Sequence, residues 1–243
     1  MKIIKLSAID STNSFLKKIA LNTTIDDFTV VIAESQNKGR GQMHAKWFSE
    51  SGKNLTFSMF CKVGALDPEH QKYLNFAVSL SVFEALQALK LPKLAIKWPN
   101  DIMSANKKVC GILIESSIKG GRIANAVIGV GLNVNQTNFP KELPNASSLK
   151  LIMNKNYNLE EVLYLIVDRL KMNINLVKEN SFSELEKRYL NVLYKKNVPS
   201  MFKTAQNVLF LGKIIGVSKI GKLQIELENE TVEEFDLKEV SFA

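Results

Sequence analysis

The sequence has little cysteine, histidine or arginine, and these shortages narrow the chemistry it can carry out. Its 243 residues include two cysteines, Cys61 and Cys110, and two histidines. Two cysteines cannot build a disulfide framework, and neither has the cysteine and histidine neighbours that a metal or nucleophile site needs. Both lie in apolar, strand-like runs, so we expect buried thiols.

Arginine is rare although the chain is basic. The net charge is +8 and the pI is near 9.3, yet only four of the 32 basic residues are arginine, and the lysines are spread along the chain. A groove that binds nucleic acid usually clusters its cations. The spread indicates a solvated surface or attraction of an acidic partner, and DNA is not an expected partner.

Long apolar runs are also missing. No uninterrupted apolar span reaches the roughly 18 residues of a membrane helix. The apolar stretch within the N-terminal MKIIKLSAID is too short for a signal peptide. We therefore expect a cytoplasmic protein with no membrane partner. With 46% hydrophobic residues, the chain can bury one substantial core and a small appendage.

The segment 95–115, AIKWPNDIMSANKKVCGILIE, gathers the most candidate functional side chains. An apolar run leads into KWPND at 97–101, and a polar turn with Lys107 and Lys108 precedes a second apolar run, 109–116. Because proline has no N–H for a strand ladder, pairing should stop at Pro99 and leave Asn100 and Asp101 at a strand end. The pattern predicts a β-hairpin with an acid, an amide and two ammonium groups at one site. A solvated turn would have a similar composition.

A long polar loop between two strand-like runs is the second candidate segment. A β-branched run ends at Ala33, and the next run spans 54–60. Loops of this length in compact domains are usually functional or disordered. Gly39-Arg40-Gly41 offers flexible, cationic backbone suited to a phosphate or carboxylate, and Trp47 offers a flat face for a ring. An ordinary mobile surface loop is the alternative.

Five motifs in this order resemble those of the biotin protein ligase family. They are Ser11-Thr12-Asn13, the adenylate loop Gln36 to Trp47, the KWPND motif Lys97 to Asp101, the K-x-x-G-I-L strand with Lys108 and Gly111-Ile112-Leu113, and the G-x-G-x-N strand Gly129 to Asn133. The resemblance implies an α+β fold: a mixed or antiparallel sheet covered by helices, like the class II synthetase-like biotinyl/lipoyl ligase domain, plus a small SH3-like β domain. Only ten residues precede Ser11, so the form without a DNA-binding domain is expected.

The resemblance also implies a two-step reaction. Biotin would first be joined to the α-phosphate of ATP with Mg²⁺, because a bare carboxylate is a poor acylating agent, and a lysine of a biotin carboxyl carrier protein would then attack the mixed anhydride. No tightly bound prosthetic group is expected. Since two anions meet in the first step, cations must offset their repulsion.

By resemblance and residue chemistry, Lys108 and Arg40 are the candidate catalytic cations. Candidates for biotin binding are Ser11, Thr12, Asn13, Gln36, Gly39, Arg40, Gly41, Lys108, Gly111 and Ile112; candidates for ATP binding are Arg40, Gln42, Trp47, Lys97, Asn100, Asp101, Lys108 and Asn133. Asp101 is also the candidate Mg²⁺ ligand, although the sequence leaves open whether Asn100 and Asp101 hold the nucleotide or its metal. Ser11 and Thr12 fit a helix N-cap equally well.

The adenylate loop departs from the family in one place. Where relatives commonly continue with further arginines and a glycine, this chain has Gln42-Met43-His44-Ala45. Fewer cations therefore face the phosphate, and backbone N–H groups with the Gln42 amide are expected to take a larger share of holding the adenylate.

The remaining residues predict scaffold. Helical apolar spacing appears at 68–89, 159–178 and about 182–193, and after Pro199 alternating residues with turn signals at Gly212, Gly216, Gly221 and Asn229 predict a small antiparallel β unit. We expect a catalytic domain at 1–194 and an SH3-like domain at 195–243. Two alternatives to biotin ligase remain: a lipoate or octanoate protein ligase, and a non-catalytic basic binding module.

Overall fold

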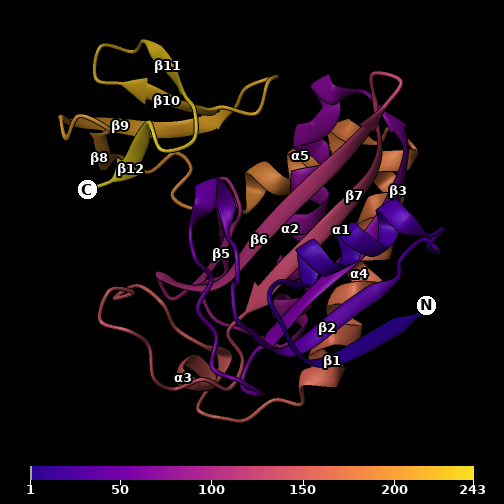
Figure 1. Cartoon of the computed structure of the whole chain (residues 1–243). Coiled ribbons are helices and arrows are strands. Elements are labelled where there is room, and N and C mark those ends of the chain that lie inside the picture. Colours follow the sequence, from indigo (N-terminus) through magenta and orange to yellow (C-terminus); the bar gives the residue numbers. More distant parts are fainter. Residues whose placement is uncertain (1) are drawn as a thin grey trace.

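A seven-stranded mixed sheet forms the centre of the molecule. The computed structural model describes residues 2–243, and the sheet has the strand order β1-β2-β3-β7-β6-β5-β4 (Figure 1). Its strands are β1 (Ile3–Ile9), β2 (Val30–Gln36), β3 (Leu55–Leu66), β4 (Ala95–Lys97), β5 (Asp101–Ser104), β6 (Lys107–Lys119) and β7 (Arg122–Leu132). β1 and β2 pair in parallel, and every other neighbouring pair is antiparallel. The predicted mixed sheet is confirmed.

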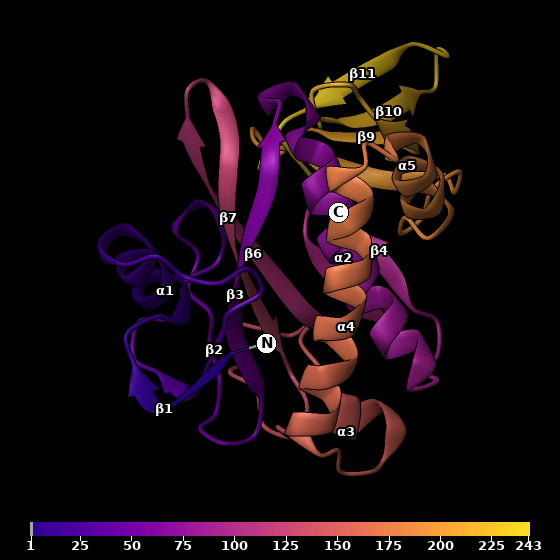
Figure 2. The same ribbon diagram turned by 90° about the vertical axis from the view of Figure 1, so that its right-hand side faces the viewer.

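Helices cover both faces of this sheet. α1 (Thr12–Asn22) lies on one face, whereas α2 (Gln71–Ala88) and α4 (Leu159–Lys178) lie on the other (Figure 2). α5 (Phe182–Asn191) packs on α2 through the stacked rings of Phe76 and Tyr189, and α3 (Leu149–Met153) is a single short turn. The three helices predicted by apolar spacing are present. The first is preceded by the 3₁₀ turn η2 (Pro68–His70), and another 3₁₀ turn, η1 (Gln42–His44), lies in the adenylate loop. Within residues 2–243, no helix has both the length and the apolar character required to cross a membrane.

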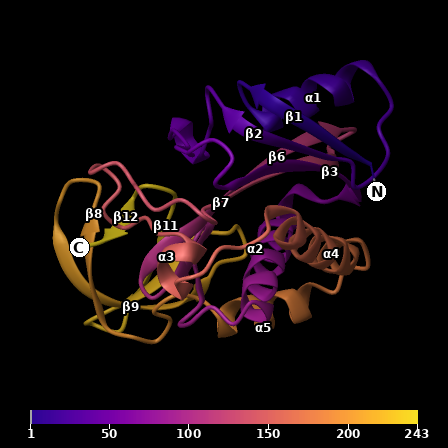
Figure 3. The same cartoon turned by 90° about the horizontal axis from the view of Figure 1, so that it is seen from below.

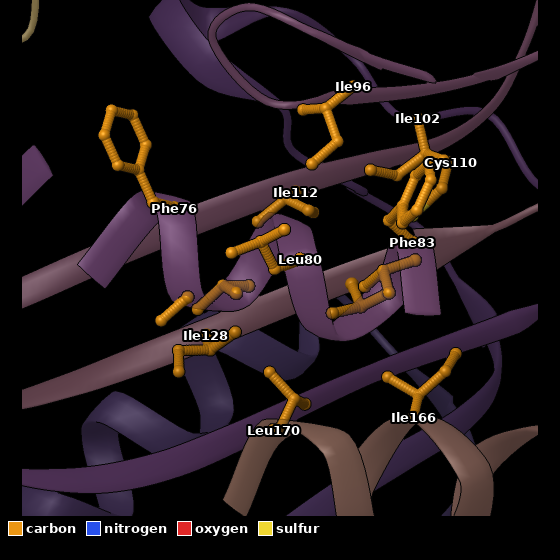
Figure 4. Close-up of a cluster of buried hydrophobic side chains, with 14 of the residues drawn as sticks. Phe76, Leu80, Phe83, Ile96, Ile102, Cys110, Ile112, Ile128, Ile166 and Leu170 are labelled. Carbon is orange, nitrogen blue, oxygen red and sulfur yellow. The ribbon is translucent and has the colours of Figure 1, made fainter. Parts of the chain in front are cut away.

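The core lies between the sheet and the α2–α4 layer. Leu80 of α2 faces Ile112 of β6 and Ile128 of β7, and Leu170 of α4 closes the layer (Figure 4). Each of these side chains is at most 2% exposed, and burying one stabilises the fold by about 1.5–3 kcal/mol. Cys110 and Cys61 are free thiols in the same core, as predicted, and burial raises the pKa of both.

The predicted hairpin at 95–116 is wrong in its connectivity. The first strand does end at Lys97, before Pro99, but the chain then forms the short strand β5, which pairs with β4 on one side and β6 on the other. The four residues of β5 are too short an apolar signal to separate from a polar turn, and a register shift at Ile102/Met103 further disturbs the pattern. The consequence is that Asp101 lies opposite Gly111.

A second, five-stranded sheet lies to one side of the layered unit (Figure 3). Its strands are β8 (Ser200–Thr204), β9 (Leu209–Val217), β10 (Leu223–Leu227), β11 (Val232–Phe235) and β12 (Val240–Phe242), all paired antiparallel. The predicted small β unit is confirmed. Two of its four predicted turn residues are wrong, because Gly212 and Gly216 lie inside β9. A Cβ on Gly212 would come within 2.6 Å of Ile225 Cγ2, so this glycine allows close packing, whereas Gly221 does form a turn, with φ +89°.

Leu80→Ala tests the core between α2 and the sheet. Because Leu80 is 2% exposed, its truncation should lower the free energy of unfolding in urea by about 2–5 kcal/mol. Leu21→Ala is the control, since Leu21 lies on α1 at 84% exposure, and it should change stability by no more than about 0.5 kcal/mol. Equal losses for the two variants would contradict this assignment of the core.

Candidate active site

A cavity of about 180 Å³ opens on the α1 face of the large sheet. It brings together the start of α1, the adenylate loop, the start of β5, the first half of β6 and the end of β7. It is lined by most of the residues predicted from sequence: Ser11, Thr12, Asn13, Gln36, Arg40, Gly41, Gln42, Trp47, Asn100, Asp101, Lys108, Gly111 and Ile112. The motifs that lie far apart in the sequence therefore meet at one place.

Strand alternation explains which atoms of β6 face the cavity. Side chains along a strand point alternately to opposite faces. Cys110 and Ile112 point into the α2–α4 core, so Ile112 offers the cavity its backbone, while Gly111, Leu113 and Glu115 share the α1 face. The backbone of Ile112 is in turn held by Asn100, whose side-chain nitrogen donates to the Ile112 carbonyl at 2.6 Å.

The start of α1 is tied to two strands by polar contacts. Ser11 caps the helix, since its hydroxyl accepts from the backbone N–H of Ser14 at 3.4 Å. The backbone N–H and hydroxyl of Thr12 both donate to Gln36 Oε1, at 2.8 and 3.0 Å. Ser58 of β3, which is fully buried, lies 2.7 Å from the Thr12 hydroxyl and also bonds Asn13 Oδ1. Sequence reasoning missed Ser58, whose only signal is a hydroxyl within an apolar strand.

The two glycines of the G-x-G motif make room for side chains from other motifs. A Cβ on Gly129 would lie 2.3 Å from Asn13 Oδ1, and a Cβ on Gly131 would lie 2.4 Å from Trp47 Cε2. The indole of Trp47 also approaches Gly111, where a Cβ would be 3.1 Å from Cζ3. The ring therefore lies across β6 and β7. Its Nε1 is buried and has no hydrogen-bond partner among the described residues, which is uncommon for a buried donor.

Lys108 is held by both its backbone and its charge. Its N–H donates to the Asn145 carbonyl at 2.7 Å and its carbonyl accepts from the Ser147 N–H at 2.9 Å. Its Nζ lies 2.6 Å from Asp101 Oδ1. The loop after β7 thus fixes the position of the Lys108 backbone. No motif in residues 134–148 indicated this function.

Glu115 holds the second cation. Its Oε2 accepts from Arg40 Nη2 at 2.8 Å and from Asn13 Nδ2 at 3.0 Å, while its Oε1 accepts from Lys17 Nζ at 2.8 Å. Burial opposes ionisation of Glu115, but the hydrogen bonds from Lys17 and Asn13 and the charge of Arg40 outweigh it and lower the pKa. Sequence reasoning missed Glu115 and Lys17. The signal for Glu115 was an acid two residues after Leu113 on the face of β6 that carries Gly111.

Three predicted site residues do not line the cavity. Gly39 packs inside the loop, where a Cβ would be 2.5 Å from the Trp47 carbonyl oxygen. Lys97 lies in a neighbouring cleft 5.4 Å from the Phe242 ring centre, and burial lowers its pKa. Asn133 donates to the Ser147 carbonyl at 3.0 Å beside Lys108, is 4% exposed, and has no partner for its Oδ1 among residues 2–243.

Gly131→Ala tests the position of Trp47. The new Cβ overlaps the indole, so the ring should leave the β6–β7 surface and its fluorescence emission should shift to longer wavelength. Trp98→Phe as background leaves Trp47 as the one tryptophan. Gly41→Ala is the control, because its Cβ would meet nothing nearer than 3.5 Å. An unchanged Gly131→Ala spectrum would place the indole elsewhere.

Comparison with known proteins agrees with this geometry. The model of the biotin/lipoate A/B protein ligase family matches residues 6–133, more than half of the chain. The bifunctional ligase/repressor BirA of Escherichia coli is 29% identical over 223 residues, which cover 91% of this chain and 68% of BirA. A biotin--[acetyl-CoA-carboxylase] ligase of Paracoccus denitrificans is 34% identical over 132 residues, or 53% of each protein. The solved structure of a biotin protein ligase from Aquifex aeolicus in complex with biotin and ATP aligns with a TM-score of 0.80 and 30% identity, over 100% of this chain and 98% of that one. The chain belongs to the biotin/lipoate A/B protein ligase family.

Proposed function

We propose that this protein is a biotin protein ligase. It activates biotin with ATP to biotinyl-5'-AMP and transfers biotin to a lysine of a biotin carboxyl carrier protein. The observation that carries the proposal is that Lys108 and Arg40 line one cavity over glycine backbone, which is the arrangement needed to join two anions. The similarity to the Aquifex aeolicus ligase, whose structure contains biotin and ATP, supports it.

The first step forms a bond between a biotin carboxylate oxygen and the α-phosphorus of ATP and breaks the bond to pyrophosphate. Lys108 stabilises the charge that accumulates where the two anions meet. Asp101, 2.6 Å from its ammonium, holds the lysine in place until a phosphate competes for it. In the second step the carrier lysine attacks the anhydride and AMP leaves, so the protein needs no covalent intermediate.

Mg²⁺ fits the cavity as a companion of the nucleotide. Asp101 is the one carboxylate that lines the cavity, and the described residues contain no cluster of three or more histidine, cysteine or acidic side chains suited to a metal. Magnesium usually keeps waters and substrate phosphates as ligands, with only one or two carboxylates from the protein. Asp101 would hold the ion, which neutralises phosphate charge when bound.

The nucleotide base has a matching acceptor in Asn133. The buried Oδ1 of Asn133 lacks a donor within residues 2–243, and the exocyclic amine of adenine supplies one. Trp47, on the adenylate loop, provides the flat ring that covers the base once the loop has moved with the ligand. Lys97 lies farther off, in the cleft beside Phe242, and we assign it to the outer phosphates.

The ureido ring of biotin needs donors and acceptors together. The Gln36 carbonyl is already committed to Thr12, so its amide N–H groups and the Ser11 hydroxyl are the donors left for a ligand, while the Thr12 hydroxyl can only accept. Lipoate has no such polar ring and leaves these groups unpaired, which disfavours it.

The proposal also assigns the two sheets to two domains. We place the boundary of the catalytic domain at residue 194, between the end of α5 and the start of β8, with the SH3-like domain at 195–243. The second sheet contacts the KWPND turn through Trp98, whose Nε1 donates to the Gly221 carbonyl at 3.1 Å. That the chain has no DNA partner and works in the cytoplasm remains a prediction from the sequence.

ATP/pyrophosphate exchange tests the function. The purified protein is incubated with ATP, Mg²⁺ and labelled pyrophosphate, together with biotin, lipoate or no acid. We expect exchange with biotin and none without an acid. Faster exchange with lipoate would assign the alternative ligase activity, and no exchange with any acid would favour the non-catalytic binding module.

Lys108→Ala should suppress adenylation far more than biotin binding. Its charge matters most when the two anions are forced together, so exchange should fall about a hundredfold, or about 3 kcal/mol. Lys107→Ala is the matched control, because this neighbouring lysine turns away and donates to the Pro144 carbonyl at 2.9 Å. Exchange within threefold of wild type in Lys108→Ala would remove Lys108 from the reaction.

Gln42→Arg should slow release of the adenylate. Gln42 lines the cavity directly after Gly39-Arg40-Gly41, and a guanidinium adds a charge-assisted bond to the phosphate worth about 1.5–3 kcal/mol in a dry site. The off-rate of preformed biotinyl adenylate is measured at low and moderate salt. Gln87→Arg adds the same charge on an exposed turn of α2 and should leave the rate unchanged. A faster or equal off-rate in Gln42→Arg would show that charge does not limit retention.

A further inference from the structure

We infer that Glu115 is a positioning residue: it orients Arg40 in the cavity and links the adenylate loop to the start of α1. This inference rests on the proposed function, because it assigns a role in the biotin-dependent reaction. Neither Glu115 nor its partner Lys17 belongs to the motifs that identify the family in this sequence.

The geometry of the Glu115 cluster (Glu115, Arg40, Asn13 and Lys17) carries the inference. One carboxylate accepts three hydrogen bonds of 2.8–3.0 Å from two separate elements: the adenylate loop, and α1 through its first and second turns. The Glu115 side chain is 19% exposed and Arg40 is 43% exposed. Because the Arg40 bond uses Nη2, the remaining N–H groups of the guanidinium stay available to a ligand.

The net charge of the Glu115 cluster indicates that Glu115 positions Arg40 without neutralising the site. A Glu115–Arg40 pair alone would be neutral and would attract an anion weakly. Lys17 bonds the other carboxylate oxygen, so the cluster of two cations and one anion keeps a surplus positive charge. Glu115 therefore holds Arg40 without cancelling the attraction of the site for carboxylate and phosphate.

A pre-oriented arginine lowers the cost of binding. A free arginine side chain must give up rotamer freedom when a ligand fixes it, whereas one already bonded to a carboxylate has lost much of that freedom in advance. Arg40 is the only arginine in the adenylate loop, residues 36–47. Its orientation consequently matters more here than in an arginine-rich loop.

The protein contains a matched control for this cluster. Glu84 of α2 accepts from Arg188 Nη2 and from Asn173 Nδ2, so it also joins an arginine and an asparagine, and its side chain is 22% exposed. These residues connect α2, α4 and α5, on the side of the sheet opposite to the cavity. Glu84→Ala therefore removes an equivalent structural contact away from the reaction.

The first test compares Glu115→Ala, Glu115→Gln and Glu84→Ala by pyrophosphate exchange and by urea unfolding. A mispositioned catalytic group can cost about a hundredfold, and we expect a loss of about that size in kcat/KM for biotin in Glu115→Ala. Glu115→Gln keeps an acceptor for Arg40 and should recover part of the activity. Glu84→Ala should lose stability but keep wild-type exchange. Losses in exchange that follow the losses in stability across all three variants would overturn the inference.

A double-mutant cycle with Arg40→Ala decides whether Glu115 acts through Arg40. If it does, the loss caused by Glu115→Ala should shrink to less than about tenfold when Arg40 is already alanine. An equal loss in both backgrounds would show an independent structural role.

Tryptic cleavage after Lys46 provides a readout that does not depend on activity. Glu115→Ala should speed this cleavage in the adenylate loop, because the loop loses its link to β6, while Glu84→Ala should not. Unchanged cleavage in Glu115→Ala would contradict the positioning role. A wild-type protein without biotin-dependent exchange would instead contradict the proposed function, so the two failures are distinguishable.

Discussion

The antiparallel pairing of β6 with β7 is the constraint on which the rest of the structure depends. Both strands present apolar side chains such as Ile112 and Ile128 to the core and glycines to the opposite face. A one-residue shift in register would exchange those faces, burying the carboxylate of Glu115 and exposing the core residues. The same pairing that stabilises the fold therefore also forms the floor of the cavity, and this explains why scaffold and site occupy the same segments.

A second constraint is that the candidate catalytic cations are each held by a carboxylate. Lys108 lies beside Asp101 and Arg40 beside Glu115. Partial burial of unpaired cations would be unfavourable, yet strong neutralisation would weaken the attraction for anions. The proposed roles resolve the conflict differently in the two cases: Asp101 would exchange Lys108 for another cation, whereas Glu115, which Lys17 also bonds, would keep its bond to Arg40.

The sequence predicted those features that depend on a short run of neighbouring residues. The KWPND and K-x-x-G-I-L segments, the long helices and the small β unit all have such patterns, and the structure brings most of the predicted site residues to one cavity. What it could not predict depends on contacts distant along the chain. Ser58 and Glu115 act on residues 45 to 102 positions away, the carbonyl of Asn145 fixes Lys108 from a loop without a motif, and β5 is too short to carry a periodic signal.

Unsatisfied polar atoms near Lys108 support the proposal that the adenylate loop and the residue after β7 serve the same nucleotide. Trp47 Nε1 and Asn133 Oδ1 are both buried and lack partners in the part of the chain that the structure describes, while neighbouring groups such as Thr12, Asn100 and Gln36 are bonded. Leaving a buried donor or acceptor unpaired costs about 1–3 kcal/mol, and a ligand that supplies the partners recovers that free energy on binding. Two such atoms, one donor on a loop and one acceptor on a strand end, therefore favour a ligand that bonds to the strand and is covered by the loop. The proposed nucleotide would supply a donor to Asn133 from the edge of its base, and movement of Trp47 over the base would take its Nε1 out of the buried position.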